Sequence, residues 1–260
     1  MSEPEELIER DVMAYDFAIV GGGPAGLACA IRLKQKLPEA SVCLLEKGSE
    51  IGAHILSGCV MEPGPLDELW PGWRDPMPSI CVPAGRDEFR LYTRKRSFRL
   101  PTPPQMHNAG NYIVSLGELC QRLAAHAESL GVEVFPGFPG RHPLIEGEGE
   151  ASRVIGVRCG DMGREADGTP DGRPGEQFAP GVDIHAGTTI LAEGCRGSLS
   201  KQLITRFGLD HEATPQTYGL GFKELWQLPA GRSTPGPGTG RSRRPSRQAG
   251  SSCGRYWPSG

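Results

Sequence analysis

Three glycines near the N-terminus have the spacing of a turn that binds phosphate. Gly21, Gly23 and Gly26 form a G-x-G-x-x-G pattern directly after the short apolar run 17–20. In such a turn the first glycine allows a tight bend, the second lets the backbone approach a pyrophosphate, and the third lets a helix pack against the strand. The N–H groups and the positive dipole end of that helix attract the phosphates. The predicted chemistry is therefore binding of a dinucleotide.

The residues that follow extend this prediction. Pro24 and Ala25 occupy the first turn of the expected helix, where a missing N–H costs little. A second apolar strand over residues 41–45 ends in Glu46, twenty residues after Gly26. Its carboxylate can accept hydrogen bonds from a ribose diol, which fits FAD or NAD and disfavours NADP. The plain alternative is a glycine-rich turn in an ordinary α/β protein.

The loop after the ribose acid is a second candidate contact region. Residues 47–58, KGSEIGAHILSG, are rich in glycine and small side chains, so the loop can pass close to a flat ligand. Its position favours contact with the dinucleotide over a plain surface connection. His54 is the only imidazole in this loop, and a lone histidine more often has a structural role. The candidate binding residues in the loop are Lys47, Gly52, Ala53, His54, Ser57 and Gly58.

Length and composition limit the remaining possibilities. The 260 residues carry a formal net charge of −3, but residues 229–260 contain six arginines and no acid. The rest of the chain has 22 basic against 31 acidic residues, which gives no reason to expect nucleic acid as a partner of the folded part. The eight cysteines show no C-x-x-C spacing, so no metal site is predicted. The acidic N-terminal extension 1–14 lacks the apolar run of a secretory signal. We expect a cytoplasmic protein and leave open a peripheral position on the cytoplasmic face of the bacterial inner membrane.

An inserted segment, about residues 60–110, follows the loop. It contains a short helical stretch at 66–69 and the sequence EFRLYTRKRSFRL at 88–100, which alternates apolar and basic residues around a charged turn. This alternation predicts an antiparallel hairpin. The hairpin can be a solvated strand pair, or its basic residues can meet the headgroups of an anionic bilayer.

The next elements predict the rest of a doubly wound sheet. Residues 115–130 predict an amphipathic helix with a capping box at Ser115 and Glu118, and Gly131 follows its last turn. After a strand come three segments of an antiparallel meander, the last two separated by a long polar loop. The ranges are 132–135 for the strand, 143–146, 154–157 and 184–186 for the meander, and 160–180 for the loop. This crossover is typical of FAD-binding Rossmann domains and therefore favours FAD.

A second strand-turn-helix junction follows. Residues 188–192 predict a buried strand that leads through Glu193 and Gly194 into a helix ending at Phe207. Ser198 is placed to cap that helix, whose N–H groups offer a further contact for phosphate. The alternative is a capped helix with no ligand.

Taken together, several segments resemble the electron-transfer-flavoprotein:ubiquinone oxidoreductases. They are GGGPAG, EKGSEIGAHILSG, RLPTPPQMHNAGNYIVSLGELC, GVEVFPGF, ILAEGCRGSLSKQLI and PQTYGLGFKELW, within residues 15–226. The resemblance implies an α/β, FAD-binding Rossmann-like domain of the glutathione-reductase type. It also implies electron transfer from reduced electron transfer flavoprotein to ubiquinone at a membrane surface. The residues that it places at FAD are Gly21, Gly23, Gly26, Glu46, Gly52 to Gly58, Glu193 and Gly194, with Glu193 standing where related flavoproteins have Asp.

The resemblance ends near residue 228. The family's second FAD-binding element, its quinone segment and the four cysteines of its [4Fe–4S] cluster have no counterpart in the sequence. Residues 229–260 are dominated by Gly, Pro, Ser and Arg and cannot bury enough surface to offset their conformational entropy. We therefore expect an FAD-binding domain over 15–228, incomplete at its C-terminus, and a disordered basic tail. A basic linker or a nucleic-acid-binding tail is the functional alternative.

Three functions stay open at this point. The first is FAD-dependent electron transfer of the family's type, with the complete activity lacking in this chain. The second is a flavoprotein like the geranylgeranyl reductases, which the PPQMHNAGNY segment disfavours. The third is an inert or merely FAD-binding truncated fragment, which the missing cluster cysteines favour.

Overall fold

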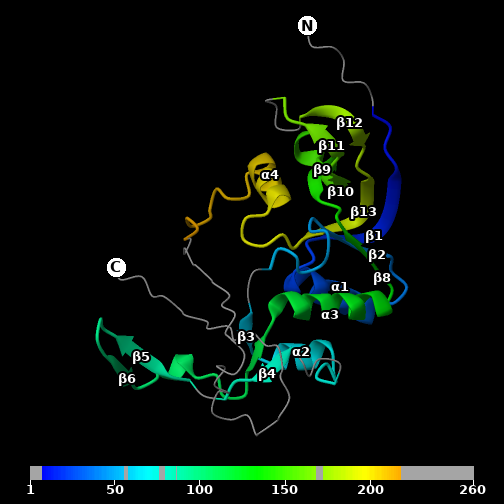
Figure 1. Cartoon of the computed structure of the whole chain (residues 1–260). Helices are drawn as coiled ribbons and strands as arrows, with labels where there is room; N and C mark the ends of the chain where they lie inside the picture. The colour runs from blue at the N-terminus through cyan, green and yellow to red at the C-terminus, as the bar shows by residue number, and fades with distance from the viewer. Residues whose placement is uncertain (1–7, 56–57, 76–79, 86, 168–171, 218–260) are drawn as a thin grey trace. The chain divides into compact units, whose positions relative to one another are not determined.

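The structure is a computed structural model that describes residues 8–55, 58–75, 80–85, 87–167 and 172–217. It divides into two units, the first made of residues 1–54 and 120–216 and the second of residues 55–119 and 217–260. Figure 1 labels the helices and strands along the chain. The tail predicted over residues 229–260 lies outside the described residues.

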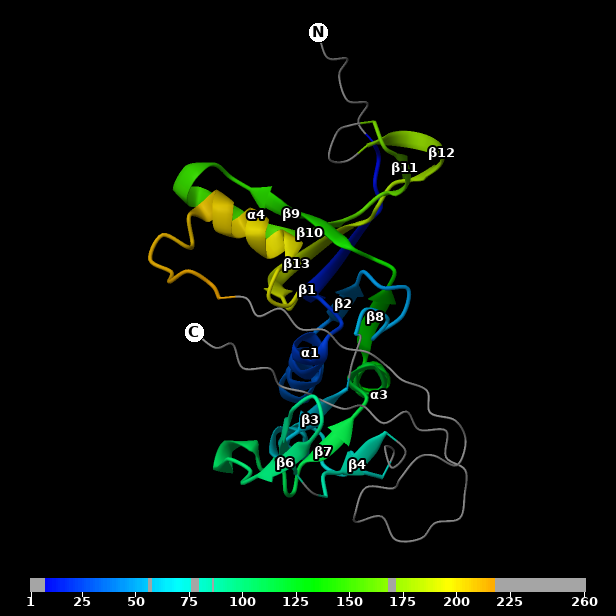
Figure 2. The same ribbon diagram turned by 60° about the vertical axis from the view of Figure 1, so that its left-hand side comes forward.

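A mixed sheet forms the centre of the first unit, in the order β8-β2-β1-β13-β10-β9 (Figure 2). The first four strands are parallel, whereas β10 and β9 are antiparallel to their neighbours. The strands are β1 (Val12–Val20), β2 (Val42–Glu46), β8 (Val132–Pro136), β9 (Gly140–Glu146), β10 (Arg153–Cys159) and β13 (Asp183–Leu191). Parallel strands joined by helices are the predicted α/β arrangement, which is confirmed.

The helices of this unit are α1 (Pro24–Lys36) and α4 (Ser198–Phe207), and α3 (Leu116–Ser129) crosses the division between the units. A short 3-10 turn, η2 (Gly149–Ala151), joins β9 to β10. The predicted helix 115–130 is confirmed in its body, and Gly131 has the positive φ, 87°, of a residue after a helix end. The capping box at Ser115 stays a prediction.

The core of the first unit is a cluster of small and β-branched side chains. Burial in it raises the pKa of Cys43 to about 12 and that of Cys159 to about 11, so both thiols stay protonated and serve as packing groups. Met13 and Tyr15 pack on the same cluster, which explains why β1 begins at Val12, inside the segment predicted as an N-terminal extension. The buried members are Ala18, Val20, Cys43, Leu45, Val157, Cys159, Ile184 and Leu199.

The prediction of one long loop at 160–180 is wrong. The segment contains a two-stranded antiparallel sheet, β11 (Met162–Glu165) and β12 (Arg173–Ala179). At Gly163 a Cβ would lie 2.1 Å from the carbonyl oxygen of Gln177, so the ribbon needs glycine where the two backbones approach. Most of its side chains are exposed, and the hydrophobic alternation that reveals a half-buried strand is therefore absent.

The predicted strands 184–186 and 188–192 are also corrected, because they form one strand, β13. Its first residues pair with β10, and its whole length pairs with β1. Gly187 suggested a break, yet it continues the strand, and a Cβ there would lie 3.2 Å from the carbonyl oxygen of Asp16. The last strand of the antiparallel meander and the next parallel strand of the sheet are thus the same strand, β13.

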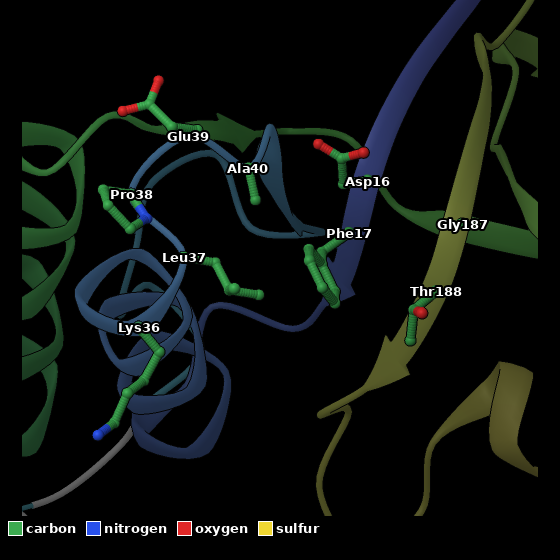
Figure 3. Close-up of a pocket in the computed structure, with 9 residues that line it drawn as sticks. All are labelled: Asp16, Phe17, Lys36, Leu37, Pro38, Glu39, Ala40, Gly187 and Thr188. Carbon is green, nitrogen blue, oxygen red and sulfur yellow. The ribbon is translucent and has the colours of Figure 1, made fainter.

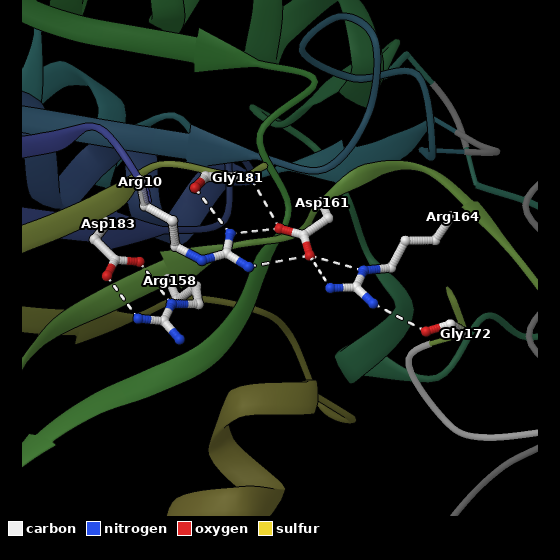
Figure 4. Close-up of polar contacts among 7 residues, drawn as sticks. All are labelled: Arg10, Arg158, Asp161, Arg164, Gly172, Gly181 and Asp183. Atoms are coloured by element: carbon white, nitrogen blue, oxygen red, sulfur yellow. Dashed lines mark hydrogen bonds and ion pairs between the residues drawn. The ribbon is translucent and has the colours of Figure 1, made fainter. Parts of the chain in front are cut away.

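An ion-pair network fixes the segment before β1 to the chain that follows β10 and to the chain that precedes β13 (Figure 4). The carboxylate of Asp161, 6% exposed, accepts hydrogen bonds from Arg10, Arg164 and the backbone N–H of Gly181. Arg10 also donates to the carbonyl oxygen of Gly181 at 2.9 Å. The Arg10 guanidinium, foremost among these partners, holds the pKa of Asp161 well below its ordinary value of 3.8.

The second unit contains a three-stranded antiparallel sheet in the order β3-β7-β4, with β3 (Cys59–Met61), β7 (Tyr112–Val114) and β4 (Cys81–Pro83). It also contains α2 (Gly64–Leu69), the 3-10 turn η1 (Pro104–Met106), and the hairpin of β5 (Phe89–Tyr92) and β6 (Ser97–Leu100). The predicted helix and hairpin are both confirmed. The indole of Trp73 is fully buried and donates to Asp67 at 2.7 Å, which ties α2 to the chain that follows it.

Candidate functional site

The glycine turn between β1 and α1 begins with a backbone conformation that favours glycine. Gly21 has a φ of 116°, and its N–H donates to the carbonyl oxygen of Leu45 at 2.8 Å. A Cβ on Gly21 would lie 2.4 Å from the carbonyl oxygen of Ala192. The first glycine therefore lets β1, β2 and the end of β13 meet in one tight turn, as the motif predicts.

The other two motif glycines differ in the space around them. A Cβ on Gly26 would lie 2.0 Å from the carbonyl oxygen of Gly21, so α1 can pack here only without a side chain. A Cβ on Gly23 would meet nothing within 4 Å. Gly23 is also the residue before the first helical turn, with no side chain capping α1. The turn thus has an open position at the place where the motif predicts a pyrophosphate.

Glu46 lies at the end of β2, beneath this turn. One carboxylate oxygen accepts the N–H of Gly22 at 2.9 Å, and the other accepts the N–H of Gly48 at 2.8 Å. The side chain is 14% exposed. A carboxylate offers about four lone-pair sites, so two hydrogen bonds leave capacity for about two more. This is the capacity that a ribose diol requires.

The structure places only part of the predicted loop 47–58 around Glu46. Nδ1 of His54 lies 3.8 Å from Oε1 of Glu46, and the imidazole side chain is 60% exposed. Lys47 and Ala53 are exposed, and Gly52 has a φ of 86° that favours glycine. Ser57 lies outside the described residues. Gly58 belongs to the second unit, so its position relative to the glycine turn is not described.

At the second junction, Glu193 fills the start of α4. Its Oε1 accepts the N–H groups of Ser198 and Leu199 at 3.0 and 3.2 Å. Its Oε2 accepts both the N–H and the hydroxyl of Ser200, each at 2.9 Å. These four hydrogen bonds use about all the lone-pair sites of the carboxylate. The start of α4 is therefore occupied by the protein's own anion.

The prediction that Ser198 caps this helix is wrong, because Ser198 is already the first helical residue and no side-chain cap comes from the residue before it, Gly197. A carboxylate is favoured over a hydroxyl at a helix start because it opposes the helix dipole and forms charge-assisted hydrogen bonds. A Cβ on Gly197 would lie 2.5 Å from Oε2 of Glu193. Gly197 is thus a positioning residue that the sequence reasoning missed, and its signal was the acid-then-glycine spacing before a helix. Gly194 is exposed, with a φ of 80°.

A separate depression of about 680 Å³ lies where the end of α1 and the chain after it meet β1 and β13 (Figure 3). Figure 3 shows Leu37 and Phe17 in its centre, carboxylates of Asp16 and Glu39 at one side, and Lys36 at another. None of the predicted cofactor residues lines it. The open helix start and the acid with spare acceptor capacity make the glycine turn, and not this depression, the candidate site.

No group of three or more His, Cys, Asp or Glu residues that could hold a metal ion occurs within the part of the chain that the structure describes. In the same part, no helix has the length and apolar character needed to cross a membrane.

Residues 19–67 match the family model of the NAD(P)-binding Rossmann-like domain. The electron transfer flavoprotein-ubiquinone oxidoreductase of Pseudomonas aeruginosa is 46% identical over 237 residues, which cover 88% of this chain and 42% of the relative. A probable electron transfer flavoprotein-ubiquinone oxidoreductase of Acinetobacter baylyi is 44% identical over 259 residues, 96% of this chain and 44% of the relative. The chain is homologous to the N-terminal part of these oxidoreductases.

This homology confirms the resemblance read from the sequence motifs, and the chain spans less than half the length of these two relatives. Among solved structures, the flavin-dependent monooxygenase PieE in complex with FAD and substrate matches with a TM-score of 0.51 and 15% identity. The match covers 75% of this chain and 32% of that one, and it supports the Rossmann-like fold alone.

Proposed function

We propose that this chain is the FAD-binding part of an oxidoreductase that passes electrons from reduced electron transfer flavoprotein to ubiquinone. The observation that carries the proposal is the identity of 44 to 46% to oxidoreductases of that name over 88 to 96% of the chain. These names favour it over a geranylgeranyl-reductase-like activity. When bound, FAD supplies the redox chemistry, and the residues of the chain bind and orient it.

FAD fits the glycine turn better than NADP does. The free N–H groups at the start of α1 attract a pyrophosphate, and the space at Gly23 lets it approach the backbone. Glu46 can accept the ribose hydroxyls, whereas a 2′-phosphate would meet its negative charge. The residues proposed to contact or shape the FAD site are Gly21, Gly23, Pro24, Ala25, Gly26, Glu46, Lys47, Gly52, Ala53, His54, Ser57, Gly58 and Gly194. Glu193 is proposed to position the turn before α4 without contacting FAD, because its carboxylate already accepts four hydrogen bonds from the protein.

The nucleotide itself provides the first test. Protein purified with its bound nucleotide and then heated should release FAD, identified by chromatography and flavin fluorescence. Release of NADP in its place would end the proposal for this site.

The hairpin β5–β6 is the proposed membrane contact. Its two faces differ, because directly opposite residues of an antiparallel pair share a face. Phe89 lies opposite Leu100 and Leu91 opposite Phe98, so one face carries four apolar side chains. All four are exposed, at 39, 38, 54 and 48% respectively.

The other face and the turn of this hairpin are basic. Arg90 lies directly opposite Arg99, and its guanidinium pairs with the carboxylate of Glu88 at 2.8 Å. Arg94, Lys95 and Arg96 form the turn and are also exposed. The basic turn can meet anionic headgroups while the apolar face enters the interface. The hairpin chemistry therefore fits an anionic bilayer.

Vesicles of neutral lipid with about 30% phosphatidylserine would test this contact by sedimentation. Leu91→Asp should weaken binding at least about tenfold, since a buried leucine contributes about 1.5 to 3 kcal/mol. Met162→Asp is the matched control, because Met162 is 66% exposed on β11 in the other unit. Equal binding of the parent and Leu91→Asp would contradict the contact.

Turnover is tested with reduced electron transfer flavoprotein and a soluble ubiquinone analogue. We expect little activity from this chain alone and activity from a version in which the remaining length of the Pseudomonas aeruginosa relative follows residue 228. The chain spans 42% of that relative, so further contacts to the cofactor can come from the rest. Equal rates from the short and extended chains would contradict this part of the proposal.

A further inference from the structure

The hairpin β5–β6 is the outer part of a longer excursion of the chain. The excursion leaves β4 and returns to β7, which are neighbouring antiparallel strands of the second unit. Beyond their paired residues, the N–H of Ala84 donates to the carbonyl oxygen of Asn111 at 2.8 Å. The returning arm carries Pro101, Pro103 and Pro104, which have no N–H to donate. A regular backbone ladder between the sheet and the hairpin is therefore disfavoured.

A carboxylate joins the two arms of this excursion. Asp87, two residues before β5, accepts the backbone N–H of Asn108 at 2.7 Å and the side-chain Nδ2 of the same residue at 2.6 Å. Nδ2 also donates to the carbonyl oxygen of Met106 at 3.1 Å. The side chain of Asn108, foremost among the partners, holds the pKa of Asp87 below its ordinary value of 3.8. The acceptor is thus charged at neutral pH, which strengthens both hydrogen bonds.

The hairpin itself is short, and all of its strand residues are exposed. Each strand has four residues, and a two-stranded hairpin of this kind is at best marginally stable by itself in water. Thr93 and Arg96 hydrogen-bond to one another across the turn, which holds the two strands together. The contact of Asp87 with Asn108 lies at the other end, between the hairpin and the sheet. It is therefore placed to fix the direction of the hairpin.

We infer that Asp87 is a positioning residue for the membrane contact, because its hydrogen bonds to Asn108 set the direction in which the hairpin leaves the sheet. The inference rests on the proposed membrane contact of β5–β6. Four apolar side chains share one face of the hairpin, and they enter a lipid interface together only when that face is presented at a suitable angle. A hairpin that already has this direction loses less conformational freedom when it binds.

Vesicles of neutral lipid with about 30% phosphatidylserine test this role on the full chain, and the sign of the effect separates positioning from charge. Asp87→Ala removes a negative charge, which by electrostatics alone would strengthen binding to an anionic surface. Loss of the direction of the hairpin should instead weaken binding about fivefold. Asp75→Ala, which removes an exposed acid elsewhere in the same unit, should bind as tightly as the parent or slightly more tightly.

An exchange of the two side chains provides a rescue. Asn108→Asp alone brings two carboxylates together and should weaken binding as Asp87→Ala does. When Asp87→Asn is combined with Asn108→Asp, the amide at position 87 can accept the backbone N–H of position 108 and donate to its carboxylate. The exchange leaves the net charge unchanged, so binding should return to within about twofold of the parent.

The same assay separates this inference from the membrane contact on which it rests. If Asp87 acts through the hairpin, Leu91→Asp should weaken binding less in the Asp87→Ala background than in the parent. Binding of Asp87→Ala that equals or exceeds that of the parent would overturn the inference and leave the membrane contact in place. A weakening that the exchange does not reverse would do the same. A parent that does not bind the vesicles would overturn the membrane contact, and the role of Asp87 with it.

Discussion

Two strand-turn-helix junctions lie side by side in the first unit, and the sequence predicts an anion at both. At the start of α1 no side chain caps the helix, and the space around Gly23 is open. At the start of α4 the carboxylate of Glu193 accepts four hydrogen bonds. A helix start can bind a ligand only where the protein has not placed an anion of its own.

The same comparison can be made between the two acids. Glu46 uses about half of its acceptor capacity and Glu193 uses about all of it. We therefore expect substitution of Glu46 to change ligand affinity and substitution of Glu193 to change stability.

The largest effects are expected from two of the three motif glycines, Gly26 and Gly23. Gly26→Val should prevent folding, because its side chain would overlap the carbonyl oxygen of Gly21, and losses above about 4 kcal/mol follow from such overlap. Gly23→Val should fold normally, with Gly23 at an ordinary φ of −82°, yet weaken FAD about 100-fold, or about 2.7 kcal/mol. Circular dichroism and FAD titration separate the two outcomes. A Gly23→Val protein that binds FAD like the parent would show that the pyrophosphate lies elsewhere.

Asp161 is a third acid for this comparison. Its carboxylate already accepts hydrogen bonds from Arg10, Arg164 and the N–H of Gly181, so its substitution should change stability alone. Its pKa is depressed in the folded state, and the stabilisation is therefore complete above its unfolded pKa and is lost as the pH falls below about 4. The expected loss is on the order of 2 kcal/mol in the free energy of unfolding. Denaturant titrations between pH 7 and pH 2 measure it. In Asp161→Asn this part of the pH dependence should disappear, and an unchanged slope would contradict the assignment.

Glu46→Gln tests the acid with spare capacity. An amide oxygen cannot accept from the two backbone N–H groups and a ribose diol together, and a hydrogen bond to a charged group is worth about 1.5 kcal/mol. We expect FAD to bind about tenfold more weakly. Fluorescence titration measures this change. Undiminished FAD affinity in Glu46→Gln would place the ribose outside the reach of this acid.

The first junction was predictable from the sequence because each motif glycine has a local steric reason that any such turn shares. Gly21 and Gly26 accordingly make the close backbone approaches expected of them, whereas the contacts of Gly23 and Glu46 with a cofactor stay predictions. The contact of Glu193 with α4 was not predictable in the same way, since an acid followed by glycine fits either a ligand or a cap. Which partner the acid takes depends on the path of the chain through Gly197.

The strand predictions failed where pairing with other strands, and not local sequence, determines the structure. Gly187 breaks a propensity pattern, yet β13 continues through it because β1 supplies partners on both sides. The ribbon β11–β12 escaped prediction because its side chains are mostly exposed and leave no hydrophobic period. Local steric rules thus predicted the glycine turn better than they predicted the strands around it.

The smallest expected effect distinguishes the two junctions most directly. Glu193→Ala removes the cap of α4 and should lower the free energy of unfolding by about 1 kcal/mol, because N–H groups at the helix start lose their acceptor. Ser198→Ala, the matched control, should have little effect, since its hydroxyl caps nothing at that helix start. Hydrogen exchange across α4 should quicken in the first variant and stay unchanged in the second.

Removing Glu193 should also make the second junction resemble the first. With the carboxylate gone, the N–H groups of Ser198, Leu199 and Ser200 form an anion site of the kind that α1 offers. Added phosphate should therefore stabilise Glu193→Ala more than the parent, while FAD affinity changes by less than about threefold. A loss of FAD as large as that expected for Gly23→Val would show that Glu193 contacts the cofactor directly. Equal phosphate stabilisation of the variant and the parent would show that the open start of a helix is not enough to create an anion site, and that the glycine turn before α1 contributes more than its free N–H groups.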